Sequence, residues 1–189
     1  MRYTTFGHRT GLRVSEYALG TGNFGTAWGA GADEDASRRM FDRFAEAGGN
    51  FLDTSDNHQF GQSEEILSKL IAADRDHFVL AGKFSVGAEP RADVSRTGNS
   101  RKNMIRSVNE SLRRLGTDFI DLYWVHVPDD LTPVEELSSW NTALWSGPPT
   151  ANSFPWPGAS DWPPPCGHPS AAVCSPASTE GEPRAGSVI

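Results

Sequence analysis

The sequence has few cysteines and no long apolar run. Its two cysteines, Cys166 and Cys174, lie close together near the C-terminal end and supply neither a disulfide framework nor a metal framework. No stretch reaches the roughly 18 consecutive apolar residues that a membrane-spanning helix needs, so no membrane span is expected. The first 24 residues lack a basic start followed by an apolar core. We therefore expect no secretory signal peptide and a cytoplasmic location.

Positive charge is also scarce. The 17 lysine and arginine residues are outnumbered by 24 acidic residues, which gives a formal net charge of −7. This balance argues against nucleic acid or an anionic membrane surface as the main partner, because both attract basic surfaces. A length of 189 residues is that of one ordinary domain.

The composition changes near Trp140. From residue 146 onward, proline, glycine and serine make up half of 44 residues, and ten of the thirteen prolines lie there. Such a segment has too few aliphatic side chains to offset the entropy lost on ordering. We predict an ordered region over residues 1–140 and a disordered tail over residues 141–189. The alternative is a proline-rich interaction tail, but the segment lacks a P-x-x-P repeat flanked by basic residues.

The first 140 residues alternate between strand and helix patterns. A hairpin is predicted over residues 2–15, where two short strand patterns flank a glycine-containing turn. Strands are then expected at residues 17–22, 50–54, 78–84 and 119–127, followed by helices capped by Asp33, Ser63, Ser100 and Thr132. Four successive strand and helix units predict an α/β fold with a parallel sheet. A doubly wound sheet and a β/α barrel both fit this pattern.

Three glycines lie at and just after the end of the first of these parallel strands. Gly20, Gly22 and Gly25 have the spacing of a dinucleotide-binding fingerprint. That fingerprint needs a helix to begin at once, so that its N-terminus lies under the diphosphate. Here residues 26–32 intervene as a loop, and the spacing alone is weak support for such a site.

Three successive strands end in titratable side chains, namely Asp53, Lys83 and His126. In a β/α barrel, reactive groups gather at the carboxyl ends of the strands, and neighbouring strands are about 5 Å apart. A lysine paired with an aspartate can steer a proton, and a histidine beside them can polarise a carbonyl oxygen. Each residue alone has a structural explanation, as a cap, a solvated charge or a packed histidine. Together they favour a site suited to hydride delivery to a carbonyl group.

Long ordered motifs surround these residues. The chain resembles the aldo-keto reductase family in its opening, over residues 11–15 and 19–22, and again over residues 50–56, 61–65, 79–84, 111–116 and 121–126. The resemblance covers residues 1 to about 139, under half of a full family barrel. It implies the N-terminal hairpin and about four βα units of a (β/α)8 barrel.

The resemblance also implies a function. It predicts NADPH-dependent reduction of an aldehyde or ketone, with NAD as an alternative cofactor, a small-molecule carbonyl substrate and no metal. The expected catalytic residues are Asp53, His58, Lys83 and His126. His58 stands where the family has a tyrosine, five residues after the aspartate. An imidazole is a poorer proton donor at neutral pH than a lysine-tuned phenol, so we expect impaired reduction.

The resemblance further predicts cofactor contacts at Gly20, Thr21, Gly22 and Asp53. Residues 158–162 are similar to the family segment that holds the nicotinamide carboxamide, which adds Ser160 and Asp161 to this set. No oligomeric state is predicted. An alternative is a non-catalytic remnant or a cofactor-binding regulatory subunit, and a reading-frame change in the gene is a hypothesis for the origin of the tail.

Overall fold

The computed structural model describes residues 1–7 and 10–138. The predictions for the tail, with Ser160 and Asp161, lie outside these residues. The chain opens with an antiparallel hairpin of two strands, β1 (Tyr3–Thr5) and β2 (Arg13–Ser15). A parallel sheet follows, in the order β3 (Ala18–Gly20), β4 (Phe51–Asp53), β5 (Val79–Phe84) and β6 (Leu122–Val125).

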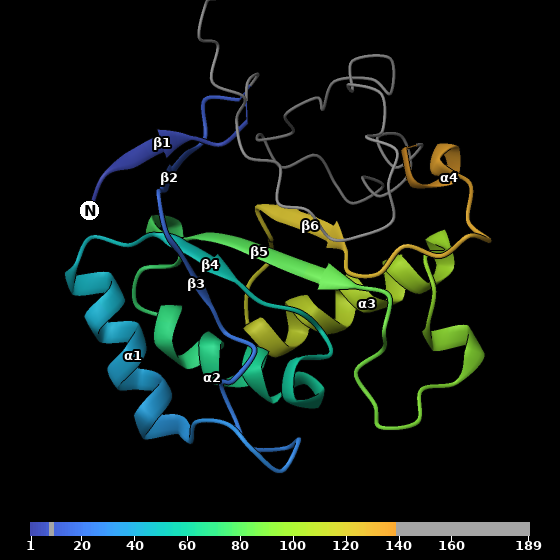
Figure 1. Ribbon diagram of the computed structural model, residues 1–189, viewed down its shortest axis with the longest axis horizontal. Coiled ribbons are helices and arrows are strands. Elements are labelled where there is room, and N and C mark those ends of the chain that lie inside the picture. The colour runs from blue at the N-terminus through green and yellow to red at the C-terminus, as the bar shows by residue number, and fades with distance from the viewer. Residues whose placement is uncertain (8–9, 139–189) are drawn as a thin grey trace, which may run out of the picture.

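Helices follow each parallel strand. They are α1 (Glu34–Glu46), α2 (Gln62–Ile71), α3 (Arg101–Leu115) and the short α4 (Val134–Ser138), with 3₁₀ turns at η1 (His58–Gly61), η2 (Arg75–His77) and η3 (Val94–Arg96). The helices α1, α2 and α3 lie on one face of the sheet (Figure 1). Strand order that follows the chain, with helices on one face, is the topology of a barrel segment. A doubly wound sheet would reverse its strand order and carry helices on both faces.

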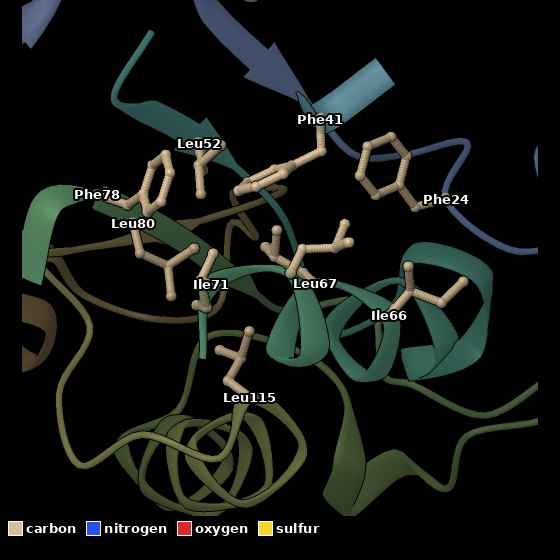
Figure 2. Close-up of a cluster of buried hydrophobic side chains, with 10 residues drawn as sticks. Phe24, Phe41, Leu52, Ile66, Leu67, Ile71, Phe78, Leu80 and Leu115 are labelled. Atoms are coloured by element: carbon tan, nitrogen blue, oxygen red, sulfur yellow. The ribbon is translucent and has the colours of Figure 1, made fainter. Parts of the chain in front are cut away.

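The main core lies between the sheet and these helices. Leu52 of β4 and Leu80 of β5 are fully buried and belong to one cluster with Phe41, Leu67 and Leu115 from the three helices (Figure 2). Each such side chain contributes about 1.5–3 kcal/mol when it leaves water. Side chains alternate between the faces of a strand, so Asp53 and Lys83 point to the face opposite these leucines.

The hairpin covers the amino ends of the strands. Val14 of β2 packs with Val79, Ala81 and Leu122 of the sheet. Asn50 joins the two parts, because its Oδ1 accepts from the backbone N–H of Ser15 at 2.7 Å and its amide donates to the carbonyl of Arg13. This end of the sheet is therefore closed by apolar packing and by buried polar groups that are paired.

Two predicted helix caps are confirmed. The carboxylate of Asp33 accepts from the backbone N–H of Ala36 at 2.8 Å, and the hydroxyl of Ser100 accepts from that of Asn103 at 3.3 Å. Each side chain satisfies a backbone donor that has no partner within the helix.

One other expectation is wrong. Ser63 does not cap α2, because the helix begins after Gly61, which has a left-handed conformation, and the Ser63 hydroxyl instead donates to the carbonyl of Thr21 at 2.7 Å. On α1, Met40 is 42% exposed, whereas Ser37 and Phe41 face the core. The apolar positions of α1 therefore do not all mark its buried face.

The outer strands of the described sheet are β3 and β6. Each pairs with one parallel neighbour within residues 1–7 and 10–138.

In the same part of the chain, no helix has the length and apolar character needed to span a membrane.

Candidate active site

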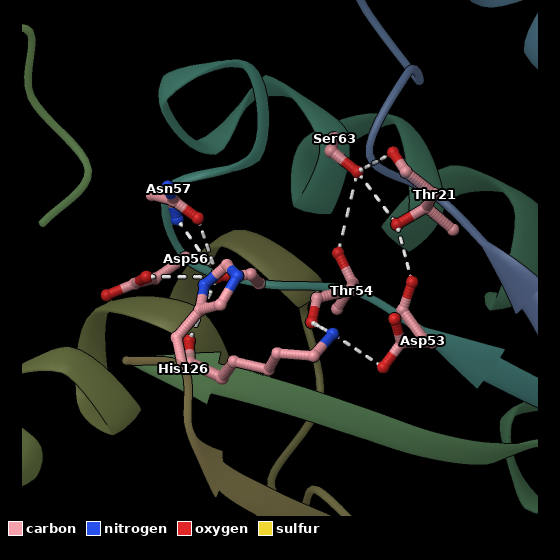
Figure 3. Close-up of polar contacts among 9 residues, drawn as sticks. Thr21, Asp53, Thr54, Asp56, Asn57, Ser63 and His126 are labelled. Atoms are coloured by element: carbon pink, nitrogen blue, oxygen red, sulfur yellow. Dashed lines mark hydrogen bonds and ion pairs between the residues drawn. The ribbon is translucent and has the colours of Figure 1, made fainter. Parts of the chain in front are cut away.

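An ion pair between neighbouring strands forms the centre of the candidate site. Lys83 Nζ lies 2.5 Å from Asp53 Oδ1 and also donates to the carbonyl of Thr54 at 3.1 Å. Figure 3 shows Asp53 and Thr54 at the end of β4. The side chains of Asp53 and Lys83 are 37% and 19% exposed, so a small molecule can reach both.

His126 follows β6 directly. Its backbone N–H donates to the carbonyl of Phe84, which continues the pairing of β5 and β6 past the last strand residue. Its Nδ1 lies 3.0 Å from the hydroxyl oxygen of Ser55. Burial and the nearby Lys83 ammonium lower the pKa of His126 below its usual value, so the ring is neutral at pH 7.

His58 lies beside His126, with the two ring centres 5.8 Å apart and the planes nearly perpendicular. Trp28 meets His58 edge to face at 6.2 Å. The Nδ1 atom of His58 is buried and has no hydrogen-bond partner in the described residues. Burial first, then the charge of Lys83, lowers the pKa of His58 to about 4. The imidazole at this position is therefore neutral at pH 7.

The backbone after His58 is strained. Gln59 and Phe60 both have positive φ, at 51° and 54°, a conformation that costs non-glycine residues roughly 1–2 kcal/mol each. The Gln59 side chain offsets this cost, because its Oε1 accepts from the Trp28 N–H at 2.8 Å and its Nε2 donates to the carbonyl of Ala30 at 3.1 Å. The side chain of Gln59 thus connects the loop after β3 to the segment that carries His58 by hydrogen bonds.

The predicted cofactor residues at the end of β3 lie beside this group. Gly20 is in register with Asp53, and a Cβ at Gly20 would meet no atom within 4 Å. A Cβ at Gly22 would lie 3.7 Å from the His58 ring. Thr21 is fully buried, and its hydroxyl donates to the Asp53 carbonyl at 3.1 Å (Figure 3). The space next to the Gly20 Cα is therefore open, whereas the Thr21 hydroxyl is bonded to the end of β4.

We call the region bounded by Asp53, His58, Lys83 and His126 the mouth of the site. The structure brings these four predicted residues together, with Gly20, Thr21 and Gly22 next to them. The roles assigned to them remain predictions, and Ser160 and Asp161 lie outside the described residues.

A buried cluster of charged residues, Asp56, Glu64 and Arg114, lies between the segment after β4 and the helices α2 and α3. Glu64 Oε2 accepts from Arg114 Nε at 2.6 Å, and both side chains are almost fully buried. Burial and the charge of Glu64 raise the pKa of Asp56 to about 6. Gly61 has φ +90° and leaves no room for a Cβ, which would lie 2.9 Å from Arg114 Cδ. These contacts join the motif over residues 61–65, at the start of α2, to the motif over residues 111–116, at the end of α3.

Sequence reasoning missed three residues around the mouth. Ser55 follows Asp53 by two positions, so a search for hydroxyl groups near a strand end would have found it. Trp28 is a large aromatic residue in a glycine-containing loop that follows a strand, which is also a readable signal. No local pattern reveals the role of Gln59, because it depends on tertiary contacts.

The fold and the mouth together define a β/α-barrel protein with an aspartate, a lysine and a histidine at the carboxyl ends of adjacent strands. The model of the Aldo/keto reductase family matches residues 17–143, and the chain belongs to this family.

Individual relatives agree with the family assignment. The chain is 38% identical over 136 residues to norsolorinic acid reductase of Aspergillus flavus, a match that covers 67% of this chain and 35% of the relative. It is 39% identical over 140 residues to the aryl-alcohol dehydrogenase [NADP(+)] of Phanerodontia chrysosporium, covering 67% and 36%. An aldo-keto reductase of Bacillus halodurans, solved in its holo form, superposes with a TM-score of 0.64 at 32% identity, covering 74% and 44%. The chain thus spans well under half the length of each of these proteins.

Proposed function

We propose that the mouth transfers hydride between a reduced nicotinamide and an aldehyde or ketone, with NADPH as the cofactor and NADH as the alternative. The observation that carries this proposal is the Asp53–Lys83 ion pair with two imidazoles beside it at the carboxyl ends of parallel strands. The name of the fungal aryl-alcohol dehydrogenase supports the phosphorylated cofactor.

The residues at the mouth fit the nicotinamide end of such a cofactor. Gly20 leaves open space next to Asp53, and the Asp53 carboxylate is accessible there. We propose that these two residues hold the nicotinamide, with Thr21 and Gly22 shaping the wall beneath it. When bound, this group supplies the hydride.

Lys83 is the donor to the substrate oxygen in this proposal. An ammonium has three N–H donors, and two are used by Asp53 and the Thr54 carbonyl. The third is directed to a carbonyl oxygen that enters the mouth, where it stabilises the negative charge that develops on hydride transfer. His126 borders the same space from the side of β6.

Proton delivery to that oxygen falls to His58, which stands where the family has a tyrosine. With a pKa of about 4, His58 is neutral at pH 7 and a weak acid in its neutral form. We therefore propose that reduction by this chain is slow. The same observation favours a second candidate function, in which the chain binds the cofactor without turnover as a regulatory subunit.

The test uses the full chain of 189 residues. NADPH is titrated by fluorescence, and its oxidation is followed with a generic aromatic aldehyde. We expect Lys83→Met to lower turnover by about 100-fold or more, since it removes the charged donor. Lys69→Met is the matched control, because Lys69 pairs with Glu34 on the exposed helix surface and its loss leaves turnover unchanged. Binding of NADPH without turnover supports the second function. If the chain neither binds NADPH nor reduces the aldehyde, both proposed functions are contradicted.

A second variant tests the slow proton step. His58→Tyr is expected to raise aldehyde reduction by about 10-fold or more, because a phenol with a pKa near 10 stays protonated at pH 7 and, with its pKa lowered by the nearby lysine ammonium, can give its proton to the substrate oxygen. Phe60→Tyr is the control, since it adds a phenol to an exposed neighbour of Trp28. An unchanged rate in His58→Tyr, measured beside a wild-type chain that turns over, would contradict the proposed role.

A further inference from the structure

The bond between His126 and Ser55 decides which nitrogen of the imidazole carries the proton. A neutral imidazole has one N–H and one bare nitrogen, and the partner of one nitrogen fixes the state of the other. The Nδ1 atom of His126 lies 3.0 Å from the Ser55 hydroxyl oxygen, which has one proton to donate. The other neighbours of that hydroxyl determine where its proton goes.

Besides His126, these neighbours are three oxygen acceptors and one backbone donor. The hydroxyl of Ser55 lies 2.8 Å from Asn57 Oδ1, 3.3 Å from Asp56 Oδ1 and 3.4 Å from the carbonyl oxygen of Lys83, and its oxygen accepts from the backbone N–H of Asn57 at 3.5 Å. The shortest of the contacts, to Asn57 Oδ1, is a normal O–H···O hydrogen bond. With its proton directed to Asn57 Oδ1, the Ser55 oxygen acts as an acceptor with two lone pairs, and His126 Nδ1 must then donate to it.

We propose that Ser55 holds His126 in the tautomer with its proton on Nδ1, so that Nε2 is a bare hydrogen-bond acceptor. Burial and the Lys83 ammonium favour the neutral ring, in which only one nitrogen is protonated. The two nitrogens of an imidazole point in divergent directions, so Nε2 is directed away from Ser55. Within residues 1–7 and 10–138, Nε2 forms no hydrogen bond that would oppose this assignment.

The assignment bears on the substrate, and this step rests on the proposed function. A bare Nε2 matches the hydroxyl hydrogen of an alcohol, whereas a carbonyl oxygen offers it no proton. Lys83 remains the donor for a carbonyl oxygen. The mouth therefore has one donor for the carbonyl form and one acceptor for the alcohol form. Ser55 is thus a positioning residue that makes the site bind primary or secondary alcohols.

The tautomer can be measured without cofactor or turnover. The full chain is labelled with ¹⁵N-histidine, and long-range ¹H–¹⁵N correlation spectra at pH 7 report which nitrogen of each ring is protonated. The His126→Gln variant identifies the His126 resonances by their loss. We expect Nε2 of His126 in the unprotonated range and Nδ1 in the protonated range. The reverse pattern would overturn the proposal.

Two variants at Ser55 test the origin of the tautomer. In Ser55→Ala, we expect the Nε2 resonance to move to the protonated range and Nδ1 in the opposite direction, because a neutral histidine side chain in water prefers its proton on Nε2. Ser55→Thr keeps the hydroxyl and should keep the wild-type pattern. Ser63→Ala is the matched control, since it removes an equally buried hydroxyl that bonds to Thr21. An unchanged pattern in Ser55→Ala would also overturn the proposal.

The outcome is separable from that of the proposed function. If His126 is protonated on Nδ1 but the chain shows no turnover, the proposed tautomer is supported and the proposed reductase activity is contradicted. If the chain turns over but His126 is protonated on Nε2, the reductase activity is supported and the tautomer is contradicted. If both hold, Ser55→Ala is expected to weaken binding of benzyl alcohol more than binding of benzaldehyde, a difference that a purely structural role would not produce.

Discussion

The two ends of the parallel sheet differ in how their buried polar groups are paired. At the amino end, the hairpin packs on Val79, Ala81 and Leu122, and Asn50 pairs with the backbone of β2. At the carboxyl end, His58 keeps a buried nitrogen without a partner in the described residues. The side-chain groups of Asn50 at the amino end are paired, whereas at the carboxyl end a nitrogen of His58 is not. The barrel topology separates stability from function in this way.

Backbone conformation follows the same division. The non-glycine residues with positive φ in the described chain, Gln59, Phe60 and Ser85, all lie beyond the carboxyl ends of β4 and β5. Such conformations cost of order 1–3 kcal/mol each and persist where neighbouring contacts enforce them. Ser85 is held by its hydroxyl, which donates to Asn99 Oδ1 at 2.6 Å.

The largest expected effect concerns the buried Glu64–Arg114 ion pair, which lies near the carboxyl end of the sheet. A large contribution of this pair to stability would show that the carboxyl end does not serve function alone. Glu64→Gln leaves the Arg114 guanidinium buried without its carboxylate partner. We expect a loss of about 3 kcal/mol in the free energy of unfolding, measured by urea denaturation. Glu65→Gln changes the exposed neighbour on the same helix and should lie within about 0.5 kcal/mol of wild type. Equal effects of the two variants would contradict the buried pair.

The next effect sharpens the comparison at the amino end. Asn50→Ala removes the acceptor for the buried N–H of Ser15 and a donor to Arg13. We expect a loss of about 2 kcal/mol in the free energy of unfolding, since a buried donor is left unpaired. Cofactor affinity of the remaining folded protein should not change. Asn109→Ala, on the exposed side of α3, serves as control. If Asn50→Ala lost cofactor affinity while its free energy of unfolding stayed unchanged, the amino end would serve binding and not stability, contrary to the comparison.

The smallest effect is a dependence of stability on pH that arises at the carboxyl end. The pKa of His58, about 4, is below its unfolded value of 6.5, so its contribution to stability rises with pH between these values. The pKa of Asp56, about 6, is above its unfolded value of 3.8, so its contribution falls as pH rises over that window. The two slopes oppose each other between about pH 4 and 6.

Variants separate the two contributions. Relative to wild type, stability of Asp56→Asn should increase more steeply from pH 4 to 6, and stability of His58→Tyr should decrease over the same range. The measurement is chemical denaturation at a series of pH values. Parallel curves for all three proteins would show that neither group is perturbed by the fold.

Much of the fold follows from local sequence. The hairpin, the four parallel strands and the caps Asp33 and Ser100 were predictable, because alternation of apolar residues and capping chemistry act within a few residues. Ser63 misled for the same reason. Its position before an apolar run suits a cap, but a tertiary contact with Thr21 takes its hydroxyl.

The candidate site was partly predictable as well. Asp53, Lys83 and His126 could be grouped because parallel strands bring their carboxyl ends together. Ser55 and Trp28 carried local signals, a hydroxyl near a strand end and an aromatic residue in a glycine-containing loop. Their partners could not be predicted, nor could the role of Gln59, because these contacts join segments that are distant in sequence. Pairing patterns identify the strands that meet, whereas loop contacts depend on backbone conformations such as the positive φ of Gln59.

The amide of Gln59 has a mechanical consequence. It bridges the loop that carries Trp28 and the turn that carries His58, through bonds to Trp28 N and to the carbonyls of Gly22 and Ala30. An outward displacement of the loop that keeps these hydrogen bonds also carries the His58 imidazole outward. Under the proposed function, the width of the site and the position of its proton donor therefore change together.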